Sequence, residues 1–352
     1  MNELKDFFQA KRVFITGHTG FKGSWLSKLM LDLGAEVKGY SLPALEESHF
    51  NSLNISNNLI HQEGDIRDLN TLSKSILEFK PQIVFHLAAQ AFVGLSYRDP
   101  ISTYETNVLG SLNLLKSVNE SESTRSLVYI TSDKCYENLE FNRGYNETDR
   151  LGGHDPYSSS KACAEILFSS FSRSFFYSHK ELGAASTRAG NVIGGGDFSE
   201  DRIVPDCIRA IREDKPIKLR SPKSTRPWQH VLEPISGYIL LAKRLFDQPS
   251  IFSKSWNFGP KLNEERNVAY LAERIIEFYG KGEIDSKKYN SDFHEANLLQ
   301  LDCTLAHEEL KWRPRLSIDQ SIKLTADWFR LVDEGQSPSI VTENQIKEYF
   351  KL

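Results

Sequence analysis

The sequence predicts a doubly wound α/β fold, in which helices cover both faces of a parallel sheet. Short apolar runs typical of buried strands alternate with segments of helical period. A glycine-rich turn joins the first strand to the first helix, and a Tyr-x-x-x-Lys pair opens a later helix. The 352 residues give ample length for a core of this kind.

Composition excludes several classes of function. Hydrophobic content of 39% and charged content of 26% are ordinary for a soluble globular protein. The net charge of −4 argues against nucleic acid as the main partner. The four cysteines have no paired spacing, which predicts neither a disulfide framework nor a metal site and favours a reducing cytoplasm. The polar N-terminus is not a signal peptide, and no apolar run approaches the roughly 18 residues of a membrane span.

A glycine loop follows the first predicted strand, residues 12–16. It reads Gly17, His18, Thr19, Gly20, Phe21, Lys22, Gly23, and the helix after it should end at Gly34. Glycines let the backbone turn tightly and approach a pyrophosphate, whose charge a helix N-terminus favours. We therefore expect these seven residues to bind a dinucleotide, with His18 and Lys22 either touching the pyrophosphate or facing solvent.

The second predicted strand, residues 37–41, departs from the usual dinucleotide pattern. It ends in Ser41-Leu42-Pro43, without the acidic residue that commonly binds the adenosine ribose. No arginine is present there to bind a 2′-phosphate, so NAD is favoured over NADP. After the next strands, Asp65 either accepts from the adenine amino group or caps a helix. The other expected cofactor contacts are Ile66, Leu87, Ala88, Ala89, Gln90 and, on the following helix, Asn107.

Polar side chains follow the apolar run 127–130. Ser132, Asp133 and Lys134 place a hydroxyl, a carboxylic acid and an amine at a strand's carboxyl end, where ligands of open α/β sheets bind. Tyr157 and Lys161 are four residues apart and share one helical face. The ammonium group can favour the ionised phenol, so a tyrosine with an ordinary pKa of about 10 becomes usable as a base toward a sugar hydroxyl.

The alternation of strands and helices stops after residue 188. We expect an NAD-binding Rossmann domain of residues 1–188, to which residues 230–260 return, and a smaller α/β substrate lobe of residues 189–229 and 261–352. The segment 218–229 is basic and includes Arg220 and Arg226. Arginine suits a second anionic ligand such as a nucleotide diphosphate; the alternative is a solvated charge run. The tail after Gly335 carries no interpretable signal.

Five motifs together resemble one family, the CDP-glucose 4,6-dehydratases of the extended short-chain dehydrogenase/reductase superfamily. They are Gly-His-Thr-Gly-Phe-Lys-Gly-Ser-Trp-Leu (17–26), Ile-Thr-Ser-Asp-Lys-Cys-Tyr (130–136), Gly-Gly-His-Asp-Pro-Tyr-Ser-Ser-Ser-Lys (152–161), Arg-Ala-Gly-Asn-Val-Ile-Gly-Gly-Gly-Asp (188–197) and Arg-Pro-Trp-Gln-His-Val-Leu-Glu-Pro (226–234). The resemblance runs from about residue 11 to about residue 330. Its most selective part is Ser-Asp-Lys at 132–134, because related dehydratases carry Thr-Asp-Glu there and 4-epimerases lack the acid/base pair.

The resemblance implies an NAD-dependent, redox-neutral conversion of CDP-glucose to CDP-4-keto-6-deoxyglucose and water. In that family's terms Tyr157, helped by Lys161 and Ser132, takes the proton of the sugar 4-hydroxyl. Asp133 protonates the departing 6-hydroxyl, and Lys134 is either the C5 base or a stabiliser of the enolate. The diphosphate would contact Asn191, Arg226, Arg202 and Arg220. A homodimer, with a tetramer as the alternative, is also implied.

Three other functions stay open. A nucleotide-sugar 4-epimerase would share Tyr157 and Lys161 but would not need Asp133 with Lys134. A dehydratase for another nucleotide sugar would share the whole catalytic set, since nothing in the residues selects cytosine. A non-catalytic protein could keep the fold and bind a dinucleotide without turnover.

Overall fold

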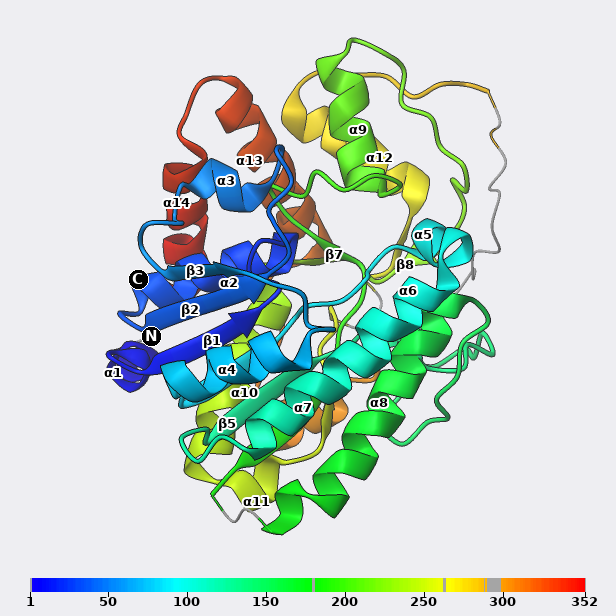
Figure 1. Cartoon of the computed structure of the whole chain (residues 1–352). Coiled ribbons are helices and arrows are strands. Elements are labelled where there is room, and N and C mark those ends of the chain that lie inside the picture. Colours follow the sequence, from blue (N-terminus) through cyan, green and yellow to red (C-terminus); the bar gives the residue numbers. More distant parts are fainter. Residues whose placement is uncertain (1, 179–180, 262–263, 288, 290–298, 352) are drawn as a thin grey trace.

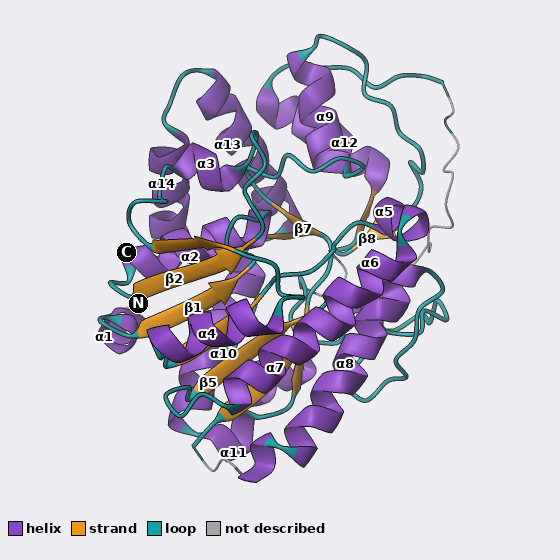
Figure 2. Ribbon diagram, viewed as in Figure 1, coloured by secondary structure: helices purple, strands orange, loops and turns teal. Residues whose placement is uncertain are grey.

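A parallel sheet runs through the centre of the computed structural model, which describes residues 2–178, 181–261, 264–287, 289 and 299–351 (Figures 1 and 2). Within these residues the sheet has seven strands in the order β10-β6-β5-β4-β1-β2-β3. The strands are β1 (Arg12–Thr16), β2 (Glu36–Ser41), β3 (Ile60–Glu63), β4 (Ile83–His86), β5 (Ser126–Ile130), β6 (Gly183–Arg188) and β10 (Ser255–Asn257). The strand order reverses between β1 and β4, which is where doubly wound sheets bind ligands. The predicted Rossmann-type sheet is confirmed.

Helices cover both faces of the sheet, because alternate residues of each strand point to opposite faces. Phe14 of β1 packs in the cluster under α4 (Leu69–Phe79), α7 (Ser111–Asn119) and α8 (Pro156–Ser174). Val13 and Ile15 pack on the opposite side, against α2 (Phe21–Asp32) and α10 (Leu232–Asp247). Figure 1 shows α4, α7 and α8 on the near face of the sheet. Burial on both faces explains why these strands are continuously apolar.

Shorter elements connect these layers or lie beyond them. The helices are α1 (Asn2–Phe8), α3 (His49–Leu53), α5 (Val93–Arg98), α6 (Pro100–Tyr104), α9 (Ile203–Arg212), α11 (Pro249–Phe252), α12 (Val268–Tyr279), α13 (Ile318–Asp333) and α14 (Pro338–Phe350). Four single turns are η1 (Glu105–Gly110), η2 (Asp133–Cys135), η3 (Phe176–Ser178) and η4 (Ala306–Leu310). Two small sheets pair β7 (Val192–Ile193) with β9 (Gln229–His230) and β8 (Thr225–Arg226) with β11 (Arg266–Asn267).

Two segments differ from what the sequence suggests. Asn107 was expected on a regular helix, but it lies in the π-helical turn η1 that leads into α7. The tail after Gly335 forms α14, whose Val341 and Ile346 are buried. Tyr349 of this helix donates a 2.7 Å hydrogen bond to the buried carboxylate of Glu233 on α10. Besides the neighbouring α13, α14 packs on α2 and α3, which lie far away in the sequence, so no local pattern reveals that it packs on the core. The division into two domains stays a prediction.

A buried ion pair ties α8 to β6 behind the strand ends. Arg188 Nη2 donates to Glu165 Oε2 at 2.8 Å, and the two side chains are only 4% and 1% exposed. Thr131, which follows β5, donates its hydroxyl to the other oxygen of Glu165. Arg188 also donates to the hydroxyl of Tyr136 at 2.8 Å. This network holds the end of β5, and hence the polar segment that follows it, against α8.

Replacing Arg188 should be strongly destabilising, because Arg188→Met leaves the Glu165 carboxylate buried without its cation. We expect the free energy of unfolding, measured by urea denaturation, to fall by about 3–5 kcal/mol. The matched control is Arg143→Met, whose side chain is 50% exposed in its ion pair with Asp149 and should lose about 0–1 kcal/mol. Equal losses in the two variants would contradict the structural role of the buried pair.

Candidate active site

A cavity of about 750 Å³ opens at the carboxyl edge of the sheet. It is lined by the glycine loop, the ends of β2 to β6, the start of α8 and the segment 189–228. The predicted site residues that line it are Gly17, Thr19, Gly20, Phe21, Lys22, Gly23, Asp65, Ile66, Leu87, Ala88, Ala89, Gln90, Ser132, Asp133, Lys134, Tyr157, Lys161, Asn191, Arg202, Arg220 and Arg226. His18 and Asn107 are not among the lining residues.

At two positions of the glycine loop there is no room for a side chain. A Cβ on Gly17, whose φ is +74°, would lie 2.7 Å from the backbone nitrogen of Ala88. A Cβ on Gly23 would lie 2.0 Å from the carbonyl oxygen of Gly17. The loop therefore fits tightly between α2 and β4, with Gly20 as the N-cap of α2. A backbone cradle at a helix N-terminus beside a large cavity fits the pyrophosphate of a dinucleotide.

His18 points away from this cradle. Its side chain is fully buried, and its Nε2 lies 2.7 Å from Nδ1 of His61 on β3. Burial, followed by the proximity of His61, lowers the pKa of His18 to about 3, so the ring is neutral. The expectation that it faces solvent is wrong, because the small Gly39 leaves space for its ring against β2. A pyrophosphate contact of this side chain stays a prediction that its burial does not favour.

Lys22 lines the cavity and meets other charged groups there. Burial and the positive charge of Arg202 lower the pKa of Lys22 to about 8, while the negative charge of Asp133 opposes this shift. The glycine loop thus brings a cation to the same part of the cavity as the predicted acid. Contact of Lys22 with the pyrophosphate stays a prediction, which its place in the cavity lining favours.

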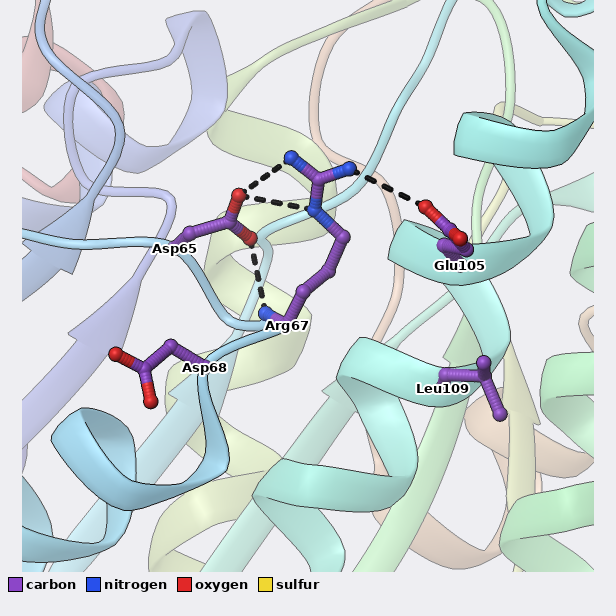
Figure 3. Close-up of a pocket in the computed structure, with 5 residues that line it drawn as sticks. All are labelled: Asp65, Arg67, Asp68, Glu105 and Leu109. Carbon is purple, nitrogen blue, oxygen red and sulfur yellow. Dashed lines mark hydrogen bonds and ion pairs between the residues drawn. The ribbon is translucent and has the colours of Figure 1, made fainter.

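The part of the cavity beside β2 and β3 carries hydroxyl groups and one carboxylate held by an arginine. Thr19 Oγ1 and Ser41 Oγ lie 2.7 Å apart, at the position where an acidic residue usually follows β2. Asp65 accepts from Arg67 at 2.9 Å through the backbone N–H and at 2.9 and 2.6 Å through the guanidinium (Figure 3). Arg67 also reaches Glu105 at 3.4 Å, and these residues border a second cavity of about 480 Å³. The hydrogen bonds from Arg67 lower the pKa of Asp65 and keep it ionised.

The triplet Ser132, Asp133 and Lys134 turns at the end of β5. Ser132 caps the turn η2 by accepting from the Lys134 N–H at 3.2 Å, and its hydroxyl donates to Asp133 Oδ1 at 2.9 Å. Asp133 is 1% exposed. Among the described residues its other oxygen, Oδ2, has no hydrogen-bond partner. Asp133 is therefore a cavity-lining residue with one buried carboxyl oxygen that lacks a partner.

Tyr157 and Lys161 lie in the first two turns of α8, whose N-terminus is capped by Asp155. Lys161 Nζ is 5.9 Å from the centre of the Tyr157 ring. Burial raises the pKa of Tyr157 to about 12, while a hydrogen bond with Ser132 and the charge of Arg202 oppose the shift. Burial, with the charge of Lys22, lowers the pKa of Lys161 to about 7. Burial therefore shifts the pKa of both groups toward the neutral form, independently of any charge on a ligand.

Asn107 supports the site from behind the cavity wall. Its Oδ1 accepts from the Gln90 N–H at 2.8 Å, and its Nδ2 donates to the Gln90 carbonyl and to Ser160 Oγ, both at 2.9 Å. The side chain is 1% exposed. The expectation that it contacts the cofactor is not favoured; it joins the end of β4 to α8 instead. The π-helical turn η1 gives Asn107 this inward position.

The far end of the cavity carries the predicted substrate residues. Arg202 bonds Asp197 at 3.3 Å, and its guanidinium lies 5.5 Å from the ring centre of Phe92. Arg220 bonds Asp201 at 3.0 Å. Asn191 has a left-handed backbone with φ 50°, and its side-chain oxygen has no partner among the described residues. A phosphate would therefore compete with carboxylates for two of the arginines.

Sequence reasoning missed several residues around this end. Phe92 and Asp197 hold Arg202, and Gln229 bonds the backbone beside Asn191. Asp197 and Gln229 lie inside motifs that carry the family resemblance, but nothing local assigns them a contact.

Within the described part of the chain no helix could span a membrane. The same residues contain no group of three or more His, Cys, Asp or Glu that could hold a metal ion.

Known proteins resemble this chain over nearly its whole length. A family model described as GDP-mannose 4,6 dehydratase matches residues 14–325. The CDP-glucose 4,6-dehydratase of Salmonella typhimurium is 45% identical over 98% of this chain and 98% of its own. A dTDP-glucose 4,6-dehydratase from Bacillus anthracis, solved with NAD, has a TM-score of 0.78 at 23% identity, covering 94% and 100% of the two chains. A UDP-glucose 4-epimerase from Thermus thermophilus, also with NAD, has a TM-score of 0.76 at 26% identity, covering 91% and 99%.

The doubly wound sheet, the glycine loop and the Tyr-x-x-x-Lys pair, with the family match and the 45% identical relative, define an enzyme of the extended short-chain dehydrogenase/reductase class. Within that class, the chain belongs to the GDP-mannose 4,6 dehydratase family. The predicted resemblance to CDP-glucose 4,6-dehydratases is confirmed by the extent of the match to the Salmonella protein.

The lowered pKa of Lys161 predicts a pH-dependent difference in stability. The folded chain, with this pKa at about 7, binds fewer protons there than the unfolded chain, so the contribution of Lys161 to stability rises with pH above 7. Lys161→Met removes this dependence. Its free energy of unfolding relative to the unmodified protein should fall as the pH rises from about 7 to about 9. Lys74→Met, on a side chain 74% exposed, is the control; the same trend in both variants would contradict the assignment.

Proposed function

We propose that this protein is a CDP-glucose 4,6-dehydratase that uses NAD. The observation that carries the proposal is that Ser132, Asp133, Lys134, Tyr157 and Lys161 line one cavity with the glycine loop. The 45% identity to a CDP-glucose 4,6-dehydratase supports the choice of substrate. The hydroxyl pair of Thr19 and Ser41 and the NAD named for the solved relatives support NAD as cofactor.

Tyr157 is the proposed base for the sugar 4-hydroxyl. Turned from Asp133 Oδ1 toward the phenolic oxygen, the Ser132 hydroxyl donates to the phenolate and stabilises it, and the cationic form of Lys161 stabilises it through charge. NAD, which the glycine loop would hold, would supply the acceptor and the returning donor of the sugar hydride. An anionic diphosphate near Lys161 and Lys22 would raise the pKa of both amines, so ligand binding favours the protonated Lys161 that the first step needs.

The 4-ketone acidifies the proton on C5, and loss of water needs an acid and a base. Asp133 is the proposed acid for the departing 6-hydroxyl, since this residue lines the cavity and its Oδ2 has no hydrogen-bond partner among the described residues. Lys134 is the proposed base for the C5 proton, and stabilisation of the enolate oxygen is its competing role. Asn191 and Arg226, with Arg202 and Arg220, are the proposed ligands of the nucleotide diphosphate.

A nucleotide-sugar 4-epimerase is the second candidate, because solved epimerases share the fold. It needs Tyr157 and Lys161 but gives no role to the paired Asp133 and Lys134.

We also propose that the protein works in a reducing cytoplasm, which the four free cysteines support.

We propose a homodimer formed through α6, η1 and α8, which carry exposed apolar residues. Ile101, Leu109 and Ile166 are 71%, 55% and 57% exposed. The double variant Leu109→Glu with Ile166→Glu should sediment as a monomer, because charge would be buried in the interface. Ile251→Glu, at a 54% exposed position on α11, is the control and should leave the assembly unchanged. A monomeric unmodified protein would refute the proposal.

Mass spectrometry of the protein with CDP-glucose and NAD in deuterated water tests the activity. Loss of one water with one deuterium gained at C5 is the expected result. Unchanged mass with altered sugar stereochemistry would establish the epimerase. Product from dTDP-, UDP- or GDP-glucose alone would assign another nucleotide sugar. Cofactor binding without any product would leave a non-catalytic protein.

Substitution of the proposed acid/base groups should separate the steps. Tyr157→Phe should lower both C4 oxidation and elimination, since a well-placed base contributes about 10²–10⁴ in rate. Lys134→Met should retain C4 oxidation, seen as reduced nicotinamide absorbance, and lose deuterium exchange at C5. Normal turnover in Tyr157→Phe, or normal exchange in Lys134→Met, would remove that residue from its role.

A further inference from the structure

Gly190 lies directly against the carboxyl group of Asp133. A Cβ at position 190 would lie 1.9 Å from Asp133 Oδ2, 2.0 Å from Cγ and 2.2 Å from Oδ1. The backbone of Gly190 is not among the left-handed glycines, so its conformation does not by itself require glycine. Position 190 must lack a side chain because the Asp133 carboxyl group occupies the space that a Cβ would take.

The turn that carries Gly190 is held by one buried side chain from a distant part of the sequence. Gln229, 1% exposed, donates through Nε2 to the Gly190 carbonyl at 3.3 Å and to the Phe258 carbonyl at 2.8 Å. Its backbone N–H donates to the Asn191 carbonyl at 3.2 Å. Gln229 therefore ties the turn that follows β6 to the loop that follows β10.

We propose that Gly190 and Gln229 are positioning residues for the elimination step. Gly190 leaves the space that the Asp133 carboxyl group occupies, and Gln229 keeps the Gly190 backbone against that group. Gly190 thereby confines the carboxyl group of Asp133, a cavity-lining residue whose Oδ1 accepts from Ser132 and whose Oδ2 lies buried against Gly190. This inference rests on the proposed function, and in particular on Asp133 as the acid.

The position of the turn explains why elimination is the step affected. Tyr157 and Lys161 belong to α8, and none of their described contacts runs through Gly190 or Gln229. Asp133 acts on Tyr157 only through its charge and through Ser132, so displacing its carboxyl group should change C4 oxidation much less than elimination. A displacement of about 1 Å at a reacting group costs on the order of 10²-fold in rate.

The test is Gly190→Ala, assayed for both steps with CDP-glucose and NAD. C4 oxidation, followed as reduced nicotinamide in a single turnover, should stay within a few fold. Loss of water should fall on the order of 10²-fold, so the oxidised intermediate accumulates. Gly259→Ala is the matched control, because a Cβ there would meet Cys303 Sγ at 3.3 Å and Leu301 Cβ at 3.4 Å. Equal loss of both steps, or of neither, would overturn the proposal.

A double-mutant cycle with Asp133→Ala separates positioning from a general structural defect. In the Asp133→Ala background, Gly190→Ala should slow the residual elimination no further, because the group that it displaces is gone. An undiminished additional loss would overturn the proposal. Gln229→Met repeats the test if Gly190→Ala does not fold, with the same selective loss expected. If the unmodified protein performs neither step, the proposed function fails; if it performs both and the variants do too, only this inference fails.

Discussion

The close approach of the glycine loop to the end of β4 is the constraint on which the site depends. Gly17 packs directly against Ala88, and Gly23 of α2 packs directly against Gly17, with no space left for a side chain at either position. That contact brings the N-terminus of α2 to the point where the strand order reverses. The cavity follows from it, since the polar ends of β1, β4 and β5 then face one space. A wider loop would separate the proposed pyrophosphate cradle from the catalytic groups.

Burial and repulsion between cations, rather than ion pairs, set the charge of the two lysines in this cavity. Lys22, Lys161 and Arg202 lie near one another, and burial with mutual repulsion lowers the pKa of both lysines. An anionic ligand would reduce that repulsion, so the repulsion among the cations of the free site favours binding of an anion. One of these cations, Arg202, also opposes the rise that burial causes in the pKa of Tyr157. Binding of an anionic ligand and activation of the base are therefore electrostatically linked.

Much of the fold was predictable because its signals are local. The parallel strands, the helix after the glycine loop and the start of α8 all follow from short-range patterns. The residues at strand ends were predictable for the same reason, since parallel strands deliver their carboxyl ends to one edge. The inward positions of His18 and Asn107 were not, because each depends on a partner from another element: His61 for one, Gln90 and Ser160 for the other.

The sequence by itself determined the class of fold, the family and the identity of the groups that can do the chemistry. Those properties reside in residue type and short spacing, such as Ser132-Asp133-Lys134 and Tyr157 with Lys161. The tertiary structure decided which groups are neutral, which are clamped and which are free to meet a ligand. Arg67 binds Asp65, and Gly190 meets Asp133 across 57 positions of sequence. Burial and contact between distant segments set these properties, and both exist only once the chain has folded.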